Sequence, residues 1–452
     1  MQSARARNRV SAPSPMSSGP AQVAKPTSPS DIAAVLRNWQ RYPTPVRAMG
    51  SGSSTTRCVV AQGGTLLDLS DMNRVLSIDE ETVTVQPGIT LPALAEVLSE
   101  QGLELIGGFD LANRTVGGAV CAAGVEACVT GDAGQFSAHV VKMKVVSPTG
   151  KKFVVSEKTK TLLGVLRLSY GLLGVVYEVT LRVRPVQGFS VQTAKVGFAD
   201  FRKLAPKLAG AGSGIKLFVL PFRDRIYIEL RRPAPKGTPG RKFAWRLKDW
   251  ACYSALPDAA RSLARAVPIR QLRYPLIDSL SEATQSLVNN ALVRSGSNSV
   301  EQSGRFRTNS TNSRFSYCTW AFPAAGFGIV MVKYQELCRR HYERSGFRCD
   351  MPAVGFRLNQ DRSALLAPSF DQPMFTISSL STQTEGWADF LLELAEFAGP
   401  HGGVPFFNQT QGVTSELVAQ RFGTRLAFFR KVRRELDPDD RLLNQFFATY
   451  ML

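Results

Sequence analysis

Residues that hold metal ions or form disulfides are few in this sequence and lie far apart. The three histidines are His139, His341 and His401. The seven cysteines form no CxxC pair and are odd in number: Cys58, Cys121, Cys128, Cys252, Cys318, Cys338 and Cys349. Because metal sites and disulfide frameworks depend on such clusters, we predict no metal site and reduced thiols, as in a cytoplasmic protein.

Long apolar runs are also absent. No stretch of about 18 or more apolar residues occurs, which predicts that no helix crosses a membrane. The N-terminus has no signal-peptide pattern, and residues 1–24 are rich in Ser, Ala, Pro and Arg without any acid. We predict a disordered tail there. A transit peptide is the alternative, although no amphipathic periodicity favours it.

The phosphate-binding motifs of two common nucleotide folds are missing. No GxGxxG precedes a helix with an acid downstream, and no Walker A motif occurs, which argues against a Rossmann site and a P-loop. Zinc-finger, RNP and homeodomain patterns are missing too, so we predict no specific nucleic-acid partner.

Acidic residues are scarce relative to basic ones. Lys and Arg number 55 against 36 Asp and Glu, a formal net charge of +19. Such an excess suits nucleic acid, an anionic membrane surface or an anionic substrate.

Residues 223–273 concentrate this charge and interleave it with aromatic residues. The aromatic residues are Phe243, Trp245 and Trp250, and the basic ones closest to them are Arg231, Arg232, Lys236, Arg241, Lys242, Arg246 and Lys248. The pattern predicts either a solvated basic loop or a segment that lies on anionic lipid. In the second case the protein would be cytoplasmic and peripheral to the inner face of the membrane.

The length of 452 residues is enough for two or three domains. Residues 25–186 alternate short β-like runs with Gly-rich turns and two helices, at 29–39 and 91–101, which predicts an α+β domain. The predicted strands are 59–60, 82–85, 140–146, 153–155 and 175–183.

Residues 187–400 predict a second α+β domain, with an inserted helical, basic segment at 259–292. Its predicted strands are 215–220, 225–230, 328–332 and 374–378, and its clearest helices are 335–346 and 387–398. Residues 401–452 form a C-terminal segment with a helix at 424–436, which Asp437-Pro438 ends.

Four Gly-containing segments of the first domain carry the functional signal. They are Arg47 to Thr56 with the small residues 50–54, Val85-Gln-Pro87-Gly88, Asn113-Arg-Thr-Val-Gly-Gly118, and Ser169-Tyr-Gly-Leu-Leu-Gly174. Small residues let backbone N–H groups converge on an anion, and hydroxyls add donors. Each segment alone is more typical of an ordinary turn, so the signal lies in their joint occurrence.

In this order the segments resemble the FAD-binding domain of the vanillyl-alcohol oxidase and p-cresol methylhydroxylase (PCMH-type) flavoproteins, over roughly residues 28–185. The resemblance implies that these loops wrap the FAD pyrophosphate and ribityl chain, with the isoalloxazine between the two domains. The implied cofactor-binding residues are Gly50, Ser51, Gly52, Ser53, Ser54, Pro87, Gly88, Thr115, Gly117, Gly118, Gly124, Gly131, Gly134, Ser137, Gly174 and Val176.

Two departures from the family bear on the flavin linkage. Many members carry a His bonded covalently to the flavin in the pattern Gly-x-Gly-His-Ser, and that position is Ser53 here. Some carry a Cys where Asn113 stands. Because neither a serine nor an amide is expected to form such a bond, we predict non-covalent FAD.

The last third resembles the sugar-oxidising branch of the family, which includes aldonolactone and alditol oxidases and decaprenylphosphoryl-ribose oxidase. Arg357 falls on the family's cationic position near the flavin, although Gly355 replaces a Glu. Gln409, beside Asn408, matches a familial Lys, and His401 is a candidate base. The alternatives are a surface or salt-bridged Arg357 and a structural His401.

These resemblances imply a fold class of α+β, with a two-part PCMH-type FAD-binding domain and an α+β substrate (cap) domain. The implied activity is oxidation of an alcohol or sugar-like, possibly lipid-linked, substrate by hydride transfer to flavin N5. Two alternatives remain: an NADPH-using flavin reductase of the enolpyruvyl-sugar type, and a basic binding protein with a vestigial flavin fold.

Overall fold

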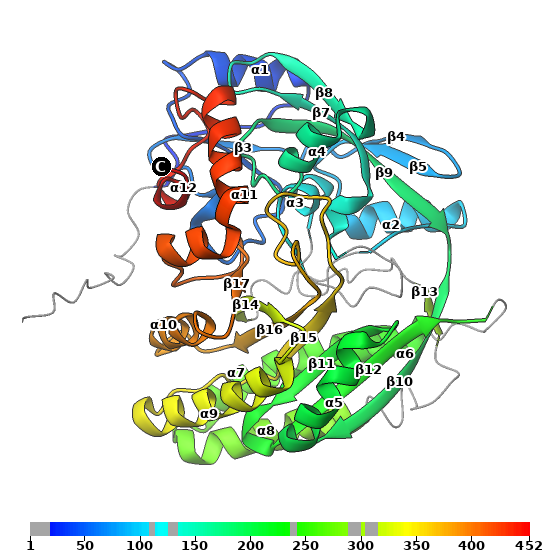
Figure 1. The fold of residues 1–452 in the computed structure, drawn as a ribbon, viewed down its shortest axis with the longest axis vertical. Helices are drawn as coiled ribbons and strands as arrows, with labels where there is room; N and C mark the ends of the chain where they lie inside the picture. Colours follow the sequence, from blue (N-terminus) through cyan, green and yellow to red (C-terminus); the bar gives the residue numbers. More distant parts are fainter. Residues whose placement is uncertain (1–18, 108–113, 125–133, 236–241, 288–299, 303–314) are drawn as a thin grey trace, which may run out of the picture.

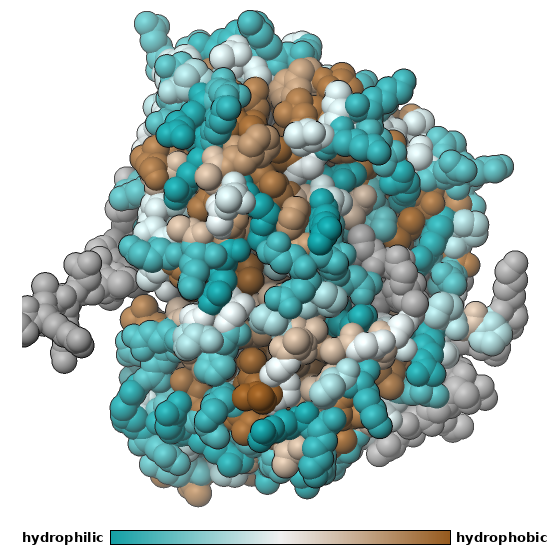
Figure 2. Space-filling model, viewed as in Figure 1, coloured by the Kyte–Doolittle hydropathy of each residue, from teal (hydrophilic) through white to brown (hydrophobic). Residues whose placement is uncertain are grey.

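The computed structural model describes residues 19–107, 114–124, 134–235, 242–287, 300–302 and 315–452 (Figure 1). Several predicted positions therefore lie outside the described residues, among them Gly131, Asn113, Lys236 and Arg241. The chain forms two halves (Figure 1). The upper half contains the residues up to Pro185 and residues 415–451, and we call it the FAD-binding half after the predicted domain. The lower half contains mainly residues 188–405, and we call it the cap half. On the face shown in Figure 2, hydrophilic side chains spread over both halves with apolar patches between them.

A small parallel sheet opens the FAD-binding half. Its strand order is β1 (Gln22–Ala24), β3 (Thr65–Asp68) and β2 (Val46–Met49). The predicted disordered tail covered residues 22–24, which is wrong, because these residues pair with Thr65–Leu67 of β3.

A larger sheet of antiparallel strands completes this half. Its order is β4 (Val75–Ile78), β5 (Thr82–Val85), β9 (Val175–Pro185), β7 (Val140–Val146) and β8 (Lys152–Ser156), and β6 (Leu103–Leu105) also pairs with β9. The predicted strand 82–85 is β5, in which Val83 and Val85 are buried while Thr82 and Thr84 are only partly buried.

Of the four helices described in this half up to Pro185, three begin at a side-chain cap and α4 begins without one. The four helices are α1 (Pro29–Arg37), α2 (Leu91–Glu100), α3 (Val116–Cys121) and α4 (Lys160–Leu166). Ser28 closes a capping box with Asp31, and Thr90 and Thr115 accept hydrogen bonds from the first turns of α2 and α3.

The cap half is built on one antiparallel sheet of eight strands. Their order is β13 (Val300–Gln302), β10 (Gly188–Val196), β12 (Arg225–Pro233), β11 (Gly214–Leu220), β15 (Ala353–Leu358), β16 (Met374–Ser381), β14 (Ser316–Pro323) and β17 (Val404–Pro405). The chain leaves the FAD-binding half at Pro185 and enters this sheet at Gly188.

The two faces of the cap sheet have different neighbours. The first face packs against α5 (Phe198–Gly210), α9 (Phe327–Ser345) and α10 (Trp387–Ala398). The second face carries α6 (Lys242–Trp250), a π-helical turn (Ala251–Ala255), α7 (Leu256–Ala266) and α8 (Arg270–Leu287). The rest of the second face turns to the FAD-binding half, where α11 (Ser415–Leu436) and α12 (Gln445–Met451) also pack.

Two predicted strands are wrong. Val59 ends a 3-10 turn (Arg57–Val59), and residues 328–332 lie in the first turns of α9. The apolar residues of α9 recur at Phe327, Val330, Met331 and Tyr334, all buried, which is a helical spacing. A short run of β-branched residues hides that period when it is considered alone.

The basic, aromatic segment is partly a buried cluster rather than a solvated loop. Trp245 and Lys248 are buried, the Lys248 Nζ lies 4.3 Å from the Trp245 ring centroid, and it forms an ion pair with Glu229. Burial opposes ionisation of Glu229, but Lys248, Lys216 and Arg231 outweigh it and lower the Glu229 pKa to about 2. The Glu229 carboxylate of β12 therefore stabilises these buried cations. The prediction of an exposed segment is wrong for Trp245, Lys248 and Arg231.

Candidate active site

One cavity gathers most of the predicted cofactor-binding residues. It is lined by loops of the FAD-binding half and by Asn408 of the C-terminal segment. The predicted residues that line it are Gly50, Ser51, Gly52, Ser53, Ser54, Pro87, Thr115, Gly117, Gly118, Gly174, Val176 and Asn408. Segments more than 300 residues apart in the chain therefore meet around one space.

The glycines of the first loop let backbones approach closely. A Cβ at Gly50 would lie 2.1 Å from the Thr115 Oγ1, so only glycine lets this loop pack against the start of α3. Gly52 has a φ of +64°, which few other residues adopt without strain. The loop thus brings main chain, rather than side chains, to the wall of the cavity.

Four predicted cofactor residues lie outside the described cavity lining. Gly88 donates its N–H to the Met72 carbonyl oxygen at 2.7 Å, and Gly124 donates to the Gln135 Oε1 at 3.1 Å. A Cβ at Gly134 would lie 2.3 Å from the Asn359 carbonyl oxygen, and Ser137 is buried in a short 3-10 turn. These residues therefore take part in turns and close backbone contacts, and they are not among the described residues that line the cavity.

Two buried arginines line the cavity, and the sequence interpretation missed both. Arg47 donates to the carbonyl oxygens of Leu442 at 2.7 Å and Cys58 at 2.9 Å, and burial lowers its pKa to about 10. Arg114 donates to the Ala123 carbonyl oxygen at 3.0 Å, and burial likewise lowers its pKa. Their positions in the sequence could have indicated them, because Arg47 lies in the strand β2 that leads into the small-residue loop, and Arg114 directly precedes the Thr-Val-Gly-Gly run.

The charge of the cavity wall has one sign. Among the described lining residues, Arg47 and Arg114 carry charge, and none is Asp, Glu or His. Two cations in a buried, carboxylate-free space favour an anionic group, such as a diphosphate.

Asn408 presents a fixed hydrogen-bond acceptor. Its Nδ2 donates to the Ala123 carbonyl oxygen at 3.0 Å, which orients the amide. Its Oδ1 is buried and has no hydrogen-bond partner among the described residues. Because a buried acceptor without a donor is costly, the Oδ1 suits an N–H of a bound group.

Gln409 lies beside Asn408 and is buried, but it is not among the described lining residues. Its carbonyl oxygen accepts from the Thr319 N–H at 3.4 Å and from the Thr55 hydroxyl at 3.3 Å. Its side-chain Oε1 is buried without a described partner. Gln409 therefore joins the cap sheet to the first cofactor loop.

Arg357 points away from the FAD-binding half. It pairs across the sheet with Phe375, whose ring stacks on Phe327 of α9, so all three lie on the first face of the cap sheet. Its Nε donates to the Ala209 carbonyl oxygen of α5 at 3.1 Å. The described cations that line the cavity are Arg47 and Arg114 and do not include Arg357, because strand register decides which face of a sheet a side chain occupies.

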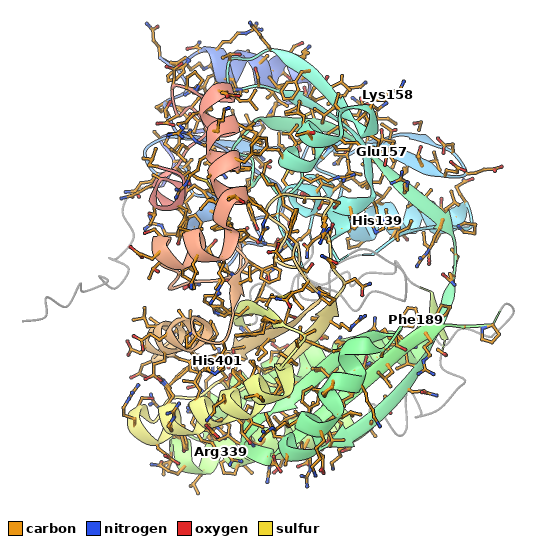
Figure 3. All side chains as sticks on the ribbon, viewed as in Figure 1. His139, Glu157, Lys158, Phe189, Arg339 and His401 are labelled. Carbon is orange, nitrogen blue, oxygen red and sulfur yellow. The ribbon has the colours of Figure 1, made fainter. Side chains whose placement is uncertain are left out.

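His401 lies in the cap half beside α10 (Figure 3). Its Nδ1 donates to the Phe397 carbonyl oxygen at 2.7 Å, and its ring stacks on the Phe397 ring with centroids 4.4 Å apart. It is not among the described lining residues of the cavity, so its contacts here are structural.

Comparison with known proteins identifies the family. The sequence profile described as "FAD binding domain" matches residues 20–156, and the profile described as "D-arabinono-1,4-lactone oxidase" matches residues 247–450. The chain is therefore a flavoprotein that combines an FAD-binding domain with a domain of the D-arabinono-1,4-lactone oxidase type. The α+β fold, the family and the cofactor FAD are thereby confirmed as predicted.

Two proteins that are similar to this flavoprotein are named as sugar-lactone dehydrogenases. An L-gulono-1,4-lactone dehydrogenase of Mycobacterium tuberculosis is 23% identical over 438 residues, which cover 94% of this chain and 95% of that protein. A mitochondrial L-galactono-1,4-lactone dehydrogenase of Arabidopsis thaliana is 28% identical over 217 residues, which cover 47% of this chain and 35% of that protein.

A solved structure shares the fold of this flavoprotein. A cholesterol oxidase from B. sterolicum superposes with a TM-score of 0.75 at 14% identity, covering 95% of this chain and 94% of that one. Among the described residues, no helix is long and apolar enough to cross a membrane.

Proposed function

We propose that this flavoprotein oxidises a CH–OH group of an aldono-1,4-lactone or a similar sugar-like alcohol, with FAD held non-covalently. The observation that carries the proposal is the cavity in which the predicted FAD loops, two buried arginines and Asn408 meet. The lactone names of the relatives and of the profile over residues 247–450 support the substrate class.

The residues of the cavity fit FAD. Gly50 to Ser54 offer close main-chain approach, and Arg47 and Arg114 offset the charge of a diphosphate. Bound there, FAD would supply a hydride acceptor at its N5. Ser53 lines the cavity at the position where many relatives carry a flavin-linking His, which supports a dissociable cofactor.

The cap sheet supplies polar groups next to this cavity. The Tyr317 hydroxyl donates to the Ser53 carbonyl oxygen at 3.4 Å, which holds β14 against the first cofactor loop. Thr319 lies two residues on and therefore faces the same way, and its hydroxyl is 2.8 Å from that of Ser378. A row of hydroxyls on this face suits a substrate rich in hydroxyl groups.

The test is reduction of the purified holoprotein under anaerobic conditions. We expect an aldono-1,4-lactone, such as L-gulono- or L-galactono-1,4-lactone, to bleach the visible flavin band, and NADPH to leave it unchanged. Bleaching by NADPH but by no lactone or sugar alcohol would instead identify a flavin reductase. Protein that is colourless and binds no added FAD would contradict the proposal altogether.

A further inference from the structure

Helix α8 presents a stripe of apolar side chains to solvent. Ile269, Leu272 and Leu276 are 56%, 59% and 49% exposed. Ile269 directly precedes α8, and its carbonyl oxygen accepts from the Arg273 N–H at 3.0 Å, so spacings of three and four residues place the three side chains along one side of the start of the helix. The opposite side is buried through Tyr274 and Ile277. Figure 1 places α8 at the end of the cap half farthest from the FAD-binding half, where nothing in the described chain covers the stripe.

Positive charge borders this stripe. The Arg223 guanidinium donates to the Pro275 carbonyl oxygen at 3.3 Å and to the Ser279 hydroxyl, so it lies on α8 beside Leu276. Arg223, Arg225 and Lys195 all lie within 4 Å of one carboxylate, that of Glu282 on the same helix. Their side chains remain 35%, 40% and 46% exposed. Asp278 of the same helix also interacts with Arg223 and pairs with the buried Arg348, so the border carries three partly exposed cations against two acids, one of which is paired below the surface.

We propose that α8 is a docking surface for an anionic phospholipid bilayer. Ile269, Leu272 and Leu276 would enter between the headgroups, while Arg223, Arg225 and Lys195 contact the negative charges of the lipid. The amphipathic stripe, its basic border and the net charge of +19 of the chain together suit that partner. The inference is independent of the oxidised substrate.

Charge complementarity favours lipid over a second copy of the chain. A symmetric dimer through α8 would bring the same excess of positive charge from both partners to one interface. An anionic surface neutralises that charge instead. The surface overlaps the predicted segment 223–273 only in part, because Trp245 and Lys248 of that segment are buried while Leu272 and Leu276 of α8 are exposed.

The test is flotation of the full-length holoprotein with phosphatidylcholine vesicles, with and without phosphatidylserine. We expect binding to the vesicles that contain phosphatidylserine, and its loss at high salt. Changing Ile269, Leu272 and Leu276 together to Ser should weaken that binding about tenfold or more, and Arg225→Gln should weaken it severalfold.

A matched control tests whether vesicle binding depends on the α8 stripe or on exposed apolar residues in general. Leu76, Ile329 and Leu392 are also exposed, on β4, α9 and α10, and their triple change to Ser should leave vesicle binding unaltered. The flavin absorbance and the thermal midpoint of each variant report folding separately from binding.

Three results would overturn the proposal. The first is no binding of the unaltered protein to either kind of vesicle. The second is an equal loss of binding in both triple variants. The third is a dimer in light scattering that the α8 variant alone converts to a monomer, since a second copy would then cover the stripe.

Discussion

Asn408 reaches the cofactor cavity with one of its two amide atoms already committed. The Nδ2 holds the Ala123 carbonyl oxygen at 3.0 Å, and the Oδ1 is left without a partner in the described structure. Because the orientation of the amide is fixed, the Oδ1 favours a bound group that places an N–H donor opposite it. We therefore predict that the Asn408 side chain contributes to cofactor binding.

We predict that Asn408→Ala weakens FAD binding about fivefold to tenfold, because a single hydrogen bond contributes about 1 kcal/mol net. The measurement is titration of the apoprotein with FAD, followed by quenching of flavin fluorescence. Asn73→Ala removes an exposed amide elsewhere and serves as the control. Equal affinities in the two variants would contradict the assigned contact.

His139 is a second residue with a measurable signature. It follows Ala138 in the FAD-binding half (Figure 3), and burial, with the positive charges of Arg184 and Arg182, lowers its pKa to about 4. The unfolded chain binds the proton near pH 6.5 while the folded chain does not, so stability falls as pH drops through the window from about 6.5 to about 4.

Replacing this imidazole should flatten that dependence. We expect the free energy of unfolding of His139→Gln to decrease less between about pH 7 and pH 5 than that of the unaltered protein, by roughly 1–2 kcal/mol. Urea-induced unfolding at the two pH values measures the difference. Parallel pH dependences in the two proteins would show that His139 takes up its proton as readily folded as unfolded.

Among the secondary-structure elements, α1 near the N-terminus is held in place by the C-terminal segment. Arg441 donates to the carbonyl oxygens of Leu36 at 3.1 Å and Val35 at 2.9 Å, at the end of α1. Its guanidinium lies over the Trp39 ring, 4.5 Å from the centroid. One buried side chain thus satisfies the last turn of a helix about 400 residues earlier.

Arg441→Met should destabilise the fold by about 2–4 kcal/mol, because it leaves buried carbonyl groups of α1 without a donor. Arg434→Met, on the exposed side of α11, should change stability by less than about 0.5 kcal/mol. Thermal or urea unfolding compares the two. If both variants were equally stable, Arg441 would not join the C-terminal segment to α1.

Element prediction from the sequence succeeded where a side-chain signal marks the boundary. The predicted helix 91–101 begins where α2 does, directly after its cap Thr90, and α11 ends before Asp437-Pro438 as predicted. Gly423, with a φ of +49°, divides α11 into two parts, and the predicted start at 424 coincides with the start of the second part. The first part, which begins at Ser415, was not predicted.

At the scale of the whole molecule, the linkage of the flavin is the simplest property to test. Because Ser53 occupies the cavity wall where relatives carry a linking His, we predict that acid precipitation releases all of the flavin into the supernatant. The absorption spectra of the supernatant and the pellet measure the partition. Flavin that stays with the precipitated protein would show a covalent bond.

The FAD-binding half and its loops could be predicted from the sequence, because close main-chain approach needs small residues at fixed positions and helix starts need capping side chains. Which charged residues line the cavity depends instead on how distant segments pack together. Arg114 lines it, whereas Arg357 sits on the opposite face of the cap sheet, paired with Phe375. The face of a strand residue depends on register against strands distant in the chain, and burial of Lys248 depends on the distant Glu229.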